Sequence, residues 1–193
     1  MAEKHGVACL VMAAGNGVRF GANKLMAEFH GKPLIEWALN AIPEDFSPVA
    51  VVTQYAAVED LSRRYGYQSI RNTHPELGVS HTIRLGVSAL AEACEGILFL
   101  VADQPLLRQE TVRRLAEAFR AHPECIVCPR ADGVRGNPCV FPADLFPALK
   151  LLEGDRGGIQ VIRRYPERVL WLEVPPEELK DVDSVDALKE LEI

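Results

Sequence analysis

The sequence contains no long apolar run. None of its 193 residues lies in a stretch that approaches the roughly 20 apolar residues required by a membrane-spanning helix. The first residues, Met-Ala-Glu-Lys-His-Gly, also lack the basic, apolar and cleavage regions of a signal peptide. These absences argue against a membrane partner and predict a cytoplasmic protein.

Basic residues are fewer than acidic ones. Lys and Arg number 21 and Asp and Glu number 27, so the formal net charge is −6. A protein that binds nucleic acid needs a basic face that exchanges with the counterions of the phosphates. This charge balance therefore argues against a nucleic-acid partner. The basic residues are expected to act at individual sites rather than to form a basic face.

Cysteine is too sparse and too irregular for a disulfide framework or a zinc site. The chain has five cysteines, an odd number that predicts reduced thiols. Cys125 and Cys128 form the one close pair, but they lie in a predicted strand, where residues three apart point to opposite faces. A tetrahedral zinc site would also need two further ligands at suitable spacing, and none occurs nearby.

Two familiar glycine fingerprints are missing as well. A dinucleotide-binding turn reads G-x-G-x-x-G, but Phe20 stands where the third glycine would be. A Walker loop ends in Gly-Lys-Ser/Thr, whereas Lys24 lies between Asn23 and Leu25. Any nucleotide site in this chain must therefore use a different loop.

The remaining pattern is that of an α/β protein. Hydrophobic residues make up 48% and charged residues 25% of the chain, and the length suits one domain that covers residues 1–193. Apolar runs alternate with helical patterns, which predicts a largely parallel sheet. The predicted strands are Val7 to Met12, Val49 to Thr53, Gln68 to Arg71, Ile97 to Val101, Cys125 to Pro129, Cys139 to Phe141 and Val169 to Val174. The clearest predicted helices are Pro33 to Ile42, Val58 to Tyr65, Val79 to Ala93, Gln109 to His122 and Ser184 to Leu191, the last with Ser184 as N-cap.

A glycine-rich loop follows the first predicted strand. Ala13 to Lys24 reads A-A-G-N-G-V-R-F-G-A-N-K, which combines three glycines with Arg19 and Lys24. Such a loop offers backbone N–H groups and two cations to a triphosphate. The alternative is that the glycines only serve turns that need a positive φ. The two cations favour nucleotide binding.

Carboxylates follow two later elements. Asp103 follows the fully apolar run Ile97 to Val101 after Ala102, where it could hold a divalent cation or simply cap a turn. Asp183 lies ahead of the last predicted helix, where it could bind metal or favour the helix dipole, and alternation would put Asp181 on the same side. Mg²⁺ prefers oxygen ligands, and one or two carboxylates plus substrate phosphates suffice to bind it.

Seven short motifs follow one another along the chain. They are A-A-G-N-G-V-R-F-G-A-N-K-L, G-K-P-L, G-V-S-H-T-I-R-L-G, A-D-Q-P, R-G-N-P, G-D-R-G-G and D-V-D-S-V-D-A-L. Over nearly the whole chain this combination resembles the molybdenum cofactor nucleotidyltransferases, and within them the cytidylyltransferase branch. The resemblance implies a Rossmann-like, three-layer α/β/α fold with a mostly parallel mixed sheet of about seven strands. It also implies Mg²⁺-dependent transfer of CMP from CTP to the phosphate of molybdopterin, with release of pyrophosphate.

The resemblance assigns roles to individual residues. The implied catalytic residues are Arg19, Lys24 and Asp103, and the implied metal ligands are Asp103 and Asp183. The implied nucleotide-binding residues are Ala13, Ala14, Gly15, Asn16, Gly17, Arg19, Lys24, Gly78, Ser80 and Thr82. The implied acceptor-binding residues are Asn137 and Asp155, in turn-rich segments of the kind that bind ligands at strand ends.

The chain departs from the family pattern at several positions. Ala14 stands where guanylyl-transferring relatives have glycine, and its methyl group would narrow the base pocket in favour of cytosine. Gly17 and Phe20 replace a usual Ser and Met, and His81 replaces a usual small residue. The replacements at Gly17, Phe20 and His81 leave the base specificity open, including the use of GTP. Within the same fold, the main alternative is transfer to another phosphorylated acceptor such as a sugar 1-phosphate, methylerythritol phosphate or phospholactate. A protein that carries the cofactor to a molybdoenzyme partner is the alternative outside enzymology.

Overall fold

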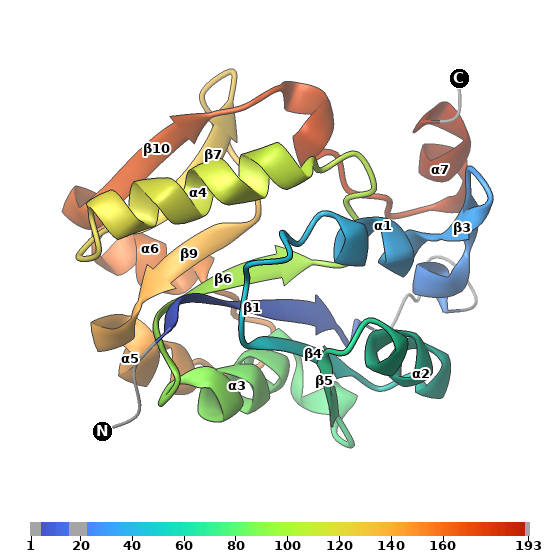
Figure 1. Cartoon of the computed structure of the whole chain (residues 1–193), viewed down its shortest axis with the longest axis horizontal. Coiled ribbons are helices and arrows are strands. Elements are labelled where there is room, and N and C mark those ends of the chain that lie inside the picture. Colours follow the sequence, from blue (N-terminus) through green and yellow to red (C-terminus); the bar gives the residue numbers. More distant parts are fainter. Residues whose placement is uncertain (1–4, 16–22, 192–193) are drawn as a thin grey trace.

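The computed structural model describes residues 5–15 and 23–191 and contains one large mixed β-sheet with helices on both faces (Figure 1). Neighbouring strands follow the order β10-β7-β9-β6-β1-β4-β5, and β8 pairs with β7. A separate hairpin joins β2 and β3. The strands are β1 (His5–Ala13), β2 (Glu28–Phe29), β3 (Lys32–Pro33), β4 (Val49–Thr53), β5 (Gln68–Arg71), β6 (Cys94–Val101), β7 (Ile126–Ala131), β8 (Val134–Arg135), β9 (Cys139–Pro142) and β10 (Val169–Glu173).

The centre of the sheet is parallel. β1 lies between β4 and β6 and is parallel to both, whereas β9 runs against its neighbours β6 and β7. β1 and β6 are almost continuous apolar runs because helices cover both of their faces. The predicted α/β class with a mostly parallel mixed sheet is therefore confirmed.

The helices form two outer layers. Helices α1 (Leu34–Asn40), α2 (Ala56–Arg64) and α4 (Gln109–Ala121) share one buried apolar cluster with residues of one sheet face. Helices α3 (Val79–Leu90), α5 (Phe146–Lys150) and α6 (Ile159–Arg164) contribute to a second cluster on the other face. The predicted three-layer arrangement is confirmed. The short 3-10 helices are η2 (Lys24–Met26), η3 (Pro75–Leu77), η4 (Ala143–Leu145), η5 (Pro166–Arg168) and η6 (Pro176–Leu179).

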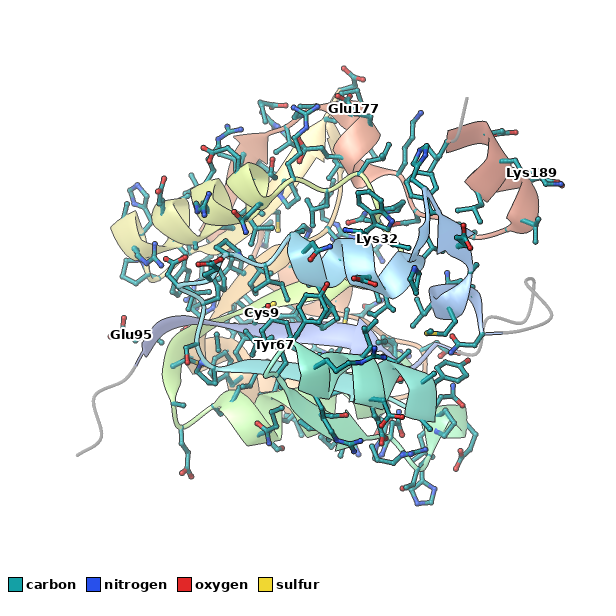
Figure 2. The ribbon with its side chains drawn as sticks, turned by 45° about the vertical axis from the view of Figure 1, so that its right-hand side comes forward. Cys9, Lys32, Tyr67, Glu95, Glu177 and Lys189 are labelled. Carbon is teal, nitrogen blue, oxygen red and sulfur yellow. The ribbon has the colours of Figure 1, made fainter. Side chains whose placement is uncertain are left out.

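The side chains follow this layering. Figure 2 shows Cys9 of β1 and Tyr67 close together inside the molecule, and Tyr67 packs against the cluster that contains Cys9. Glu95, Glu177 and Lys189 point outward from the ribbon. Within residues 5–15 and 23–191, no helix is both long enough and apolar enough to cross a lipid bilayer.

The C-terminal helix α7 (Val185–Leu191) packs apart from the two main clusters. Leu188 and Val182 form a third buried cluster with Phe29 and Leu34, at the hairpin and the start of α1. The Ala187 N–H donates to Ser184 Oγ at 3.1 Å, so the predicted N-cap is confirmed. This cluster fixes the segment that carries Asp181 and Asp183.

Several element boundaries differ from the sequence prediction. β6 begins at Cys94 rather than Ile97, because its first residues pair with the start of β1. The helix predicted over Pro33 to Ile42 begins at Leu34, and Pro33 belongs to the hairpin strand β3. Both differences arise from strand pairing, which a single segment of sequence does not reveal.

Candidate active site

The candidate site lies where β1, β4 and β6 end. These strands are parallel neighbours, so their carboxyl ends meet at one edge of the sheet, where α/β proteins bind ligands. A cavity of about 230 Å³ opens there, and we call it cavity A. The sequence-predicted site residues in its wall are Ala14, Gly15, Gly78, Thr82, Asp103 and Asp155.

Lys24 joins the two predicted metal ligands. Its Nζ donates to Asp103 Oδ2 at 2.6 Å, to the Val182 carbonyl at 3.1 Å and to Asp183 Oδ1 at 3.5 Å. Burial lowers the pKa of Lys24, but the charge and hydrogen bond of Asp103 outweigh that effect and raise the pKa above its ordinary value. Lys24 is therefore a cation at neutral pH, placed between carboxylates from segments far apart in the chain.

The same carboxylates suit a divalent cation. Asp103 and Asp183 offer oxygen atoms, the ligands that Mg²⁺ prefers, and Mg²⁺ commonly takes one or two carboxylates together with phosphates and water. Within the described residues, no group of three or more His, Cys, Asp or Glu side chains is placed to hold a metal. The two carboxylates fit the predicted metal as a partial donor set.

Asp181 lies in the same acidic group and accepts a hydrogen bond from Gln104. Gln104 is buried and donates through Nε2 to Asp181 Oδ1 at 2.8 Å and to the Leu179 carbonyl at 3.2 Å. Burial, followed by the negative charge of Asp103, raises the pKa of Asp181 to about 6. Sequence reasoning gave Gln104 no role, although its place beside Asp103 in A-D-Q-P was a signal.

The N-terminus of α3 forms the opposite wall of cavity A. Gly78 has φ +81°, and a Cβ at this position would lie 2.4 Å from the Gly154 carbonyl carbon. The Ser80 N–H donates to the Gly154 carbonyl at 3.1 Å, and Thr82 Oγ1 accepts from Asn72 at 3.2 Å. The close approach of Gly154 to Gly78 holds the neighbouring Asp155 at the cavity.

Ser80, which the sequence predicts to bind nucleotide, does not line cavity A. Its side chain is buried, its Oγ donates to the Leu77 carbonyl at 3.5 Å, and it is absent from the described lining of cavity A. The hydroxyl thus bonds to the short 3-10 helix that precedes α3, while the Ser80 N–H bonds to the Gly154 carbonyl. The structure therefore does not bring Ser80 to the pocket beside Gly78 and Thr82.

The two predicted acceptor residues, Asn137 and Asp155, line different cavities. Asn137 lines a second cavity of about 230 Å³, which we call cavity B, whereas Asp155 lines cavity A. The cavities adjoin, because Met12, Val79 and Val101 contribute to both. The other walls of cavity B include Ile83, Phe99, Phe141, Ile162 and Arg135.

Three predicted residues, Asn16, Gly17 and Arg19, lie outside the described residues, as does Phe20. Ala13 ends β1 and borders a smaller cavity of about 140 Å³ together with Lys24 and Asp103. His81 stacks edge to face with His74, with ring centroids 6.0 Å apart.

A set of hydrogen bonds beside the glycine loop was missed. Thr53 Oγ1 donates to the Ala13 carbonyl at 2.9 Å, Gln54 Nε2 to the Ala14 carbonyl at 2.9 Å and Tyr55 Oη to the Gly15 carbonyl at 2.8 Å. The three donors are consecutive residues, and so are the three acceptors. No local signal identifies them, because each bond spans 40 residues of sequence.

The fold is that of a Rossmann-like nucleotidyltransferase. Residues 9–169 match the MobA-like NTP transferase domain, so the chain belongs to that family. The resemblance inferred from the sequence is confirmed at this level.

Two curated proteins align with this chain at 29% identity. Residues of this chain are 29% identical over 119 positions to the bifunctional protein GlmU of Trichlorobacter lovleyi, an alignment that covers 59% of this chain. The chain spans about a quarter of the length of that relative, 26%. Purine catabolism protein PucB of Bacillus subtilis is 29% identical over 163 residues, which covers 79% of this chain and 78% of PucB.

Solved structures share the fold. A nucleotidyl transferase from Methanothermobacter has a TM-score of 0.82 at 22% identity and covers 97% of this chain and 96% of its own. Rv0371C of Mycobacterium tuberculosis, in complex with manganese, has a TM-score of 0.76 at 20% identity and covers 97% and 98%. Molybdopterin-guanine dinucleotide biosynthesis protein A of Archaeoglobus fulgidus has a TM-score of 0.67 at 21% identity and covers 96% of both chains.

Proposed function

We propose that this nucleotidyltransferase transfers CMP from CTP to the phosphate of molybdopterin and releases pyrophosphate. The observation that carries the proposal is the pairing of two adjoining cavities, one beside the Lys24 carboxylate group and the other mostly apolar. Cavity A would hold CTP, and cavity B would hold the acceptor. The reaction would take place in the cytoplasm and supply cofactor to a molybdoenzyme.

The walls of cavity B favour a flat ring over a polyol. They are mainly aliphatic and aromatic, with Phe99 and Phe141 packed edge to face at 5.1 Å, and Arg135 and Asn137 supply polar groups. A sugar phosphate or methylerythritol phosphate would bury several hydroxyl groups against these walls, and each unpaired hydroxyl costs free energy. A heterocycle with a polar edge, such as a pterin, suits apolar walls that carry a few polar groups.

Ala14 supports cytosine as the base. It is nearly buried at 6% exposure, and its carbonyl is held by Gln54, so its methyl group has little room to withdraw. One methyl group is worth about 1–3 kcal/mol in discrimination between ligands. This effect favours CTP over the larger base of GTP.

The proposed chemistry needs alignment and charge neutralisation rather than a general base. The acceptor phosphate is anionic at neutral pH and would attack the α-phosphorus of CTP in line, with pyrophosphate as the leaving group. Lys24 and Arg19 would offset negative charge on the phosphates. Asp103 and Asp183 would hold Mg²⁺, which supplies further charge neutralisation when bound. The carboxylate cluster around Lys24 thus has a role in both binding and turnover.

Pyrophosphate release tests the proposal. The protein would be incubated with Mg²⁺ and molybdopterin and with CTP, GTP, ATP or UTP in separate reactions. We expect multiple turnovers with CTP. Activity with GTP would indicate guanylyl transfer, and no activity with any of the four, while CTP still binds, would indicate another acceptor or a carrier.

A carboxylate variant tests the proposed site in the same assay. Asp103→Asn should reduce turnover by about 100-fold or more, because a ligand to the metal loses its charge. Asp60→Asn, on α2, is the matched control and should turn over normally. Normal turnover by Asp103→Asn would contradict the assignment, and circular dichroism would verify that both variants are folded.

A further inference from the structure

The segment that leaves β1 is held by side chains rather than by the sheet. The parallel pairing of β1 with β4 ends at Ala13 and Thr53. Beyond that point the carbonyls of Ala13, Ala14 and Gly15 are taken up in order by Thr53, Gln54 and Tyr55, at 2.8 to 2.9 Å. The hydrogen bonding between the two chain segments therefore continues past the end of the strands.

This arrangement is unusual for an extended chain. Consecutive residues of a strand alternate in direction, so a strand does not present three successive carbonyls to one neighbour. Here all three are engaged by side chains of the segment that follows β4. The three side chains therefore hold the backbone of Ala13, the last residue of β1, and of Ala14 and Gly15 beyond it.

The donors are themselves held in place. Thr53 is fully buried, and its Oγ1 also accepts the Tyr55 N–H at 3.1 Å. The Gln54 carbonyl accepts from Arg71 Nη1 at 3.1 Å, and Arg71 Nη2 donates to the buried Glu59 at 3.0 Å. These contacts limit the movement of the donors, so the three carbonyls are held by a fixed part of the fold.

The orientation matters because Ala14 and Gly15 line cavity A. A carbonyl oxygen carries partial negative charge and repels a phosphate, whereas a backbone N–H attracts it. We propose that Thr53, Gln54 and Tyr55 are positioning residues that hold these carbonyls away from a bound triphosphate and leave the opposite side of the backbone to face it. The inference rests on the proposed role of this loop in nucleotide binding and adds residues that act on the nucleotide through the loop.

Tyr55 has the chemistry that such a donor needs. Burial raises the pKa of its hydroxyl, and nearby Lys24 opposes that effect only in part, so the group keeps its proton at neutral pH. Tyr55 is also the cleanest position to alter, because replacement by phenylalanine removes the oxygen and leaves the ring. Its loss should affect the loop more than the core.

The test measures dissociation constants of CTP and of GTP with Mg²⁺, by isothermal titration calorimetry on the full chain. Tyr55→Phe and Thr53→Val should each weaken CTP binding by about two- to tenfold, the effect of one hydrogen bond. Thr53→Ser keeps the hydroxyl and should restore affinity to within about twofold of the wild type. Tyr65→Phe is the matched control, because it breaks bonds to Glu36 and Asn40 instead.

The outcomes separate the two proposals. If the wild type binds CTP and both Tyr55→Phe and Thr53→Val bind it equally well, the positioning role is wrong while nucleotide binding stands. Equal weakening by Tyr65→Phe would also overturn it, since the effect would then reflect general loosening of the fold. If the wild type binds neither CTP nor GTP, the proposed function fails and this inference fails with it. Should Thr53→Val not fold, Tyr55→Phe still decides the matter.

Discussion

At the scale of single residues, the acidic group around Lys24 contains carboxylates in different states. Asp103 is paired with Lys24 at 2.6 Å, with both side chains largely buried. Asp183 is 64% exposed and lies 3.5 Å from the same ammonium. Asp181 instead accepts from the amide of Gln104, and its pKa is raised to about 6. Lys24 thus contacts two of these carboxylates directly, and the third is bound by an amide instead.

The raised pKa of Asp181 predicts a dependence of stability on pH. The folded protein binds the proton of Asp181 more tightly than the unfolded chain, whose ordinary pKa is 3.8, so the associated stabilisation is present at low pH and is lost as pH rises through about 6. Asp181→Asn removes this loss. Its free energy of unfolding, relative to the wild type, should therefore increase between pH 4 and pH 7.5.

The increase should be about 1 kcal/mol, because Asp181 is partly exposed and solvent screens the interaction. Urea denaturation of both proteins at the two pH values measures it, and taking the difference between them cancels other titrations. A difference that stays constant, or that falls with rising pH, would show that the burial of this carboxyl has no such effect.

At the scale of elements, the start of α3 depends on close contact with the segment at Gly154. Gly78 combines φ +81° with ψ −175°, a conformation available almost only to glycine, and it leaves no room for a Cβ beside Gly154. Gly66 also has a positive φ, +76°, but a Cβ there would meet nothing within 4 Å. The pair therefore compares an uncrowded glycine of positive φ with one whose conformation and surroundings both exclude a side chain.

We expect Gly66→Ala to cost about 1–2 kcal/mol of unfolding free energy, the strain of a left-handed residue. Gly78→Ala should cost about 2 kcal/mol more, since its φ and ψ exclude a side chain more strongly and the methyl group would also push against the Gly154 backbone. Chemical denaturation of both variants tests this. Equal losses would mean that the two segments are free to separate, and that Asp155 is not held at cavity A by this contact.

At the scale of the whole molecule, the candidate site is held in place by the third apolar cluster as well as by the two main ones. The Val182 N–H donates to the Asp103 carbonyl at 2.9 Å, which joins the segment before α7 to the loop after β6. Val182 and Leu188 belong to the third apolar cluster. Loosening that cluster should therefore disturb Asp183 before it unfolds the sheet.

Leu188→Ala and Leu90→Ala test this division. Leu90, the last residue of α3, is fully buried in the second apolar cluster, so its truncation should cost about 2–5 kcal/mol of global stability. Leu188→Ala should cost less globally but should lower nucleotidyl transfer more per unit of stability lost. Thermal unfolding and the pyrophosphate assay, run on both variants, provide the comparison. A wild-type rate in Leu188→Ala would show that docking of α7 does not influence the site.

Much of the fold was predictable because its signals are local. The apolar run of β1 predicts a buried strand, the stripe of Val112, Leu115 and Phe119 predicts α4, and Ser184 predicts the start of α7, and all three are confirmed. The loop after β1 and Asp103 after β6 could also be placed, because the carboxyl ends of parallel strands share one edge. Their roles in binding and catalysis remain predictions.

What the sequence determined alone was the class of fold and the family, since apolar periodicity and collinear motifs depend on neighbouring residues. Only the tertiary structure decided that the Ser80 hydroxyl bonds to the Leu77 carbonyl, that Asp155 and Asn137 line different cavities, and that Thr53 to Tyr55 bind the carbonyls of Ala13 to Gly15. Most of these features depend on contacts between segments distant in the chain. Such contacts are set by packing and strand pairing, which local pattern does not encode.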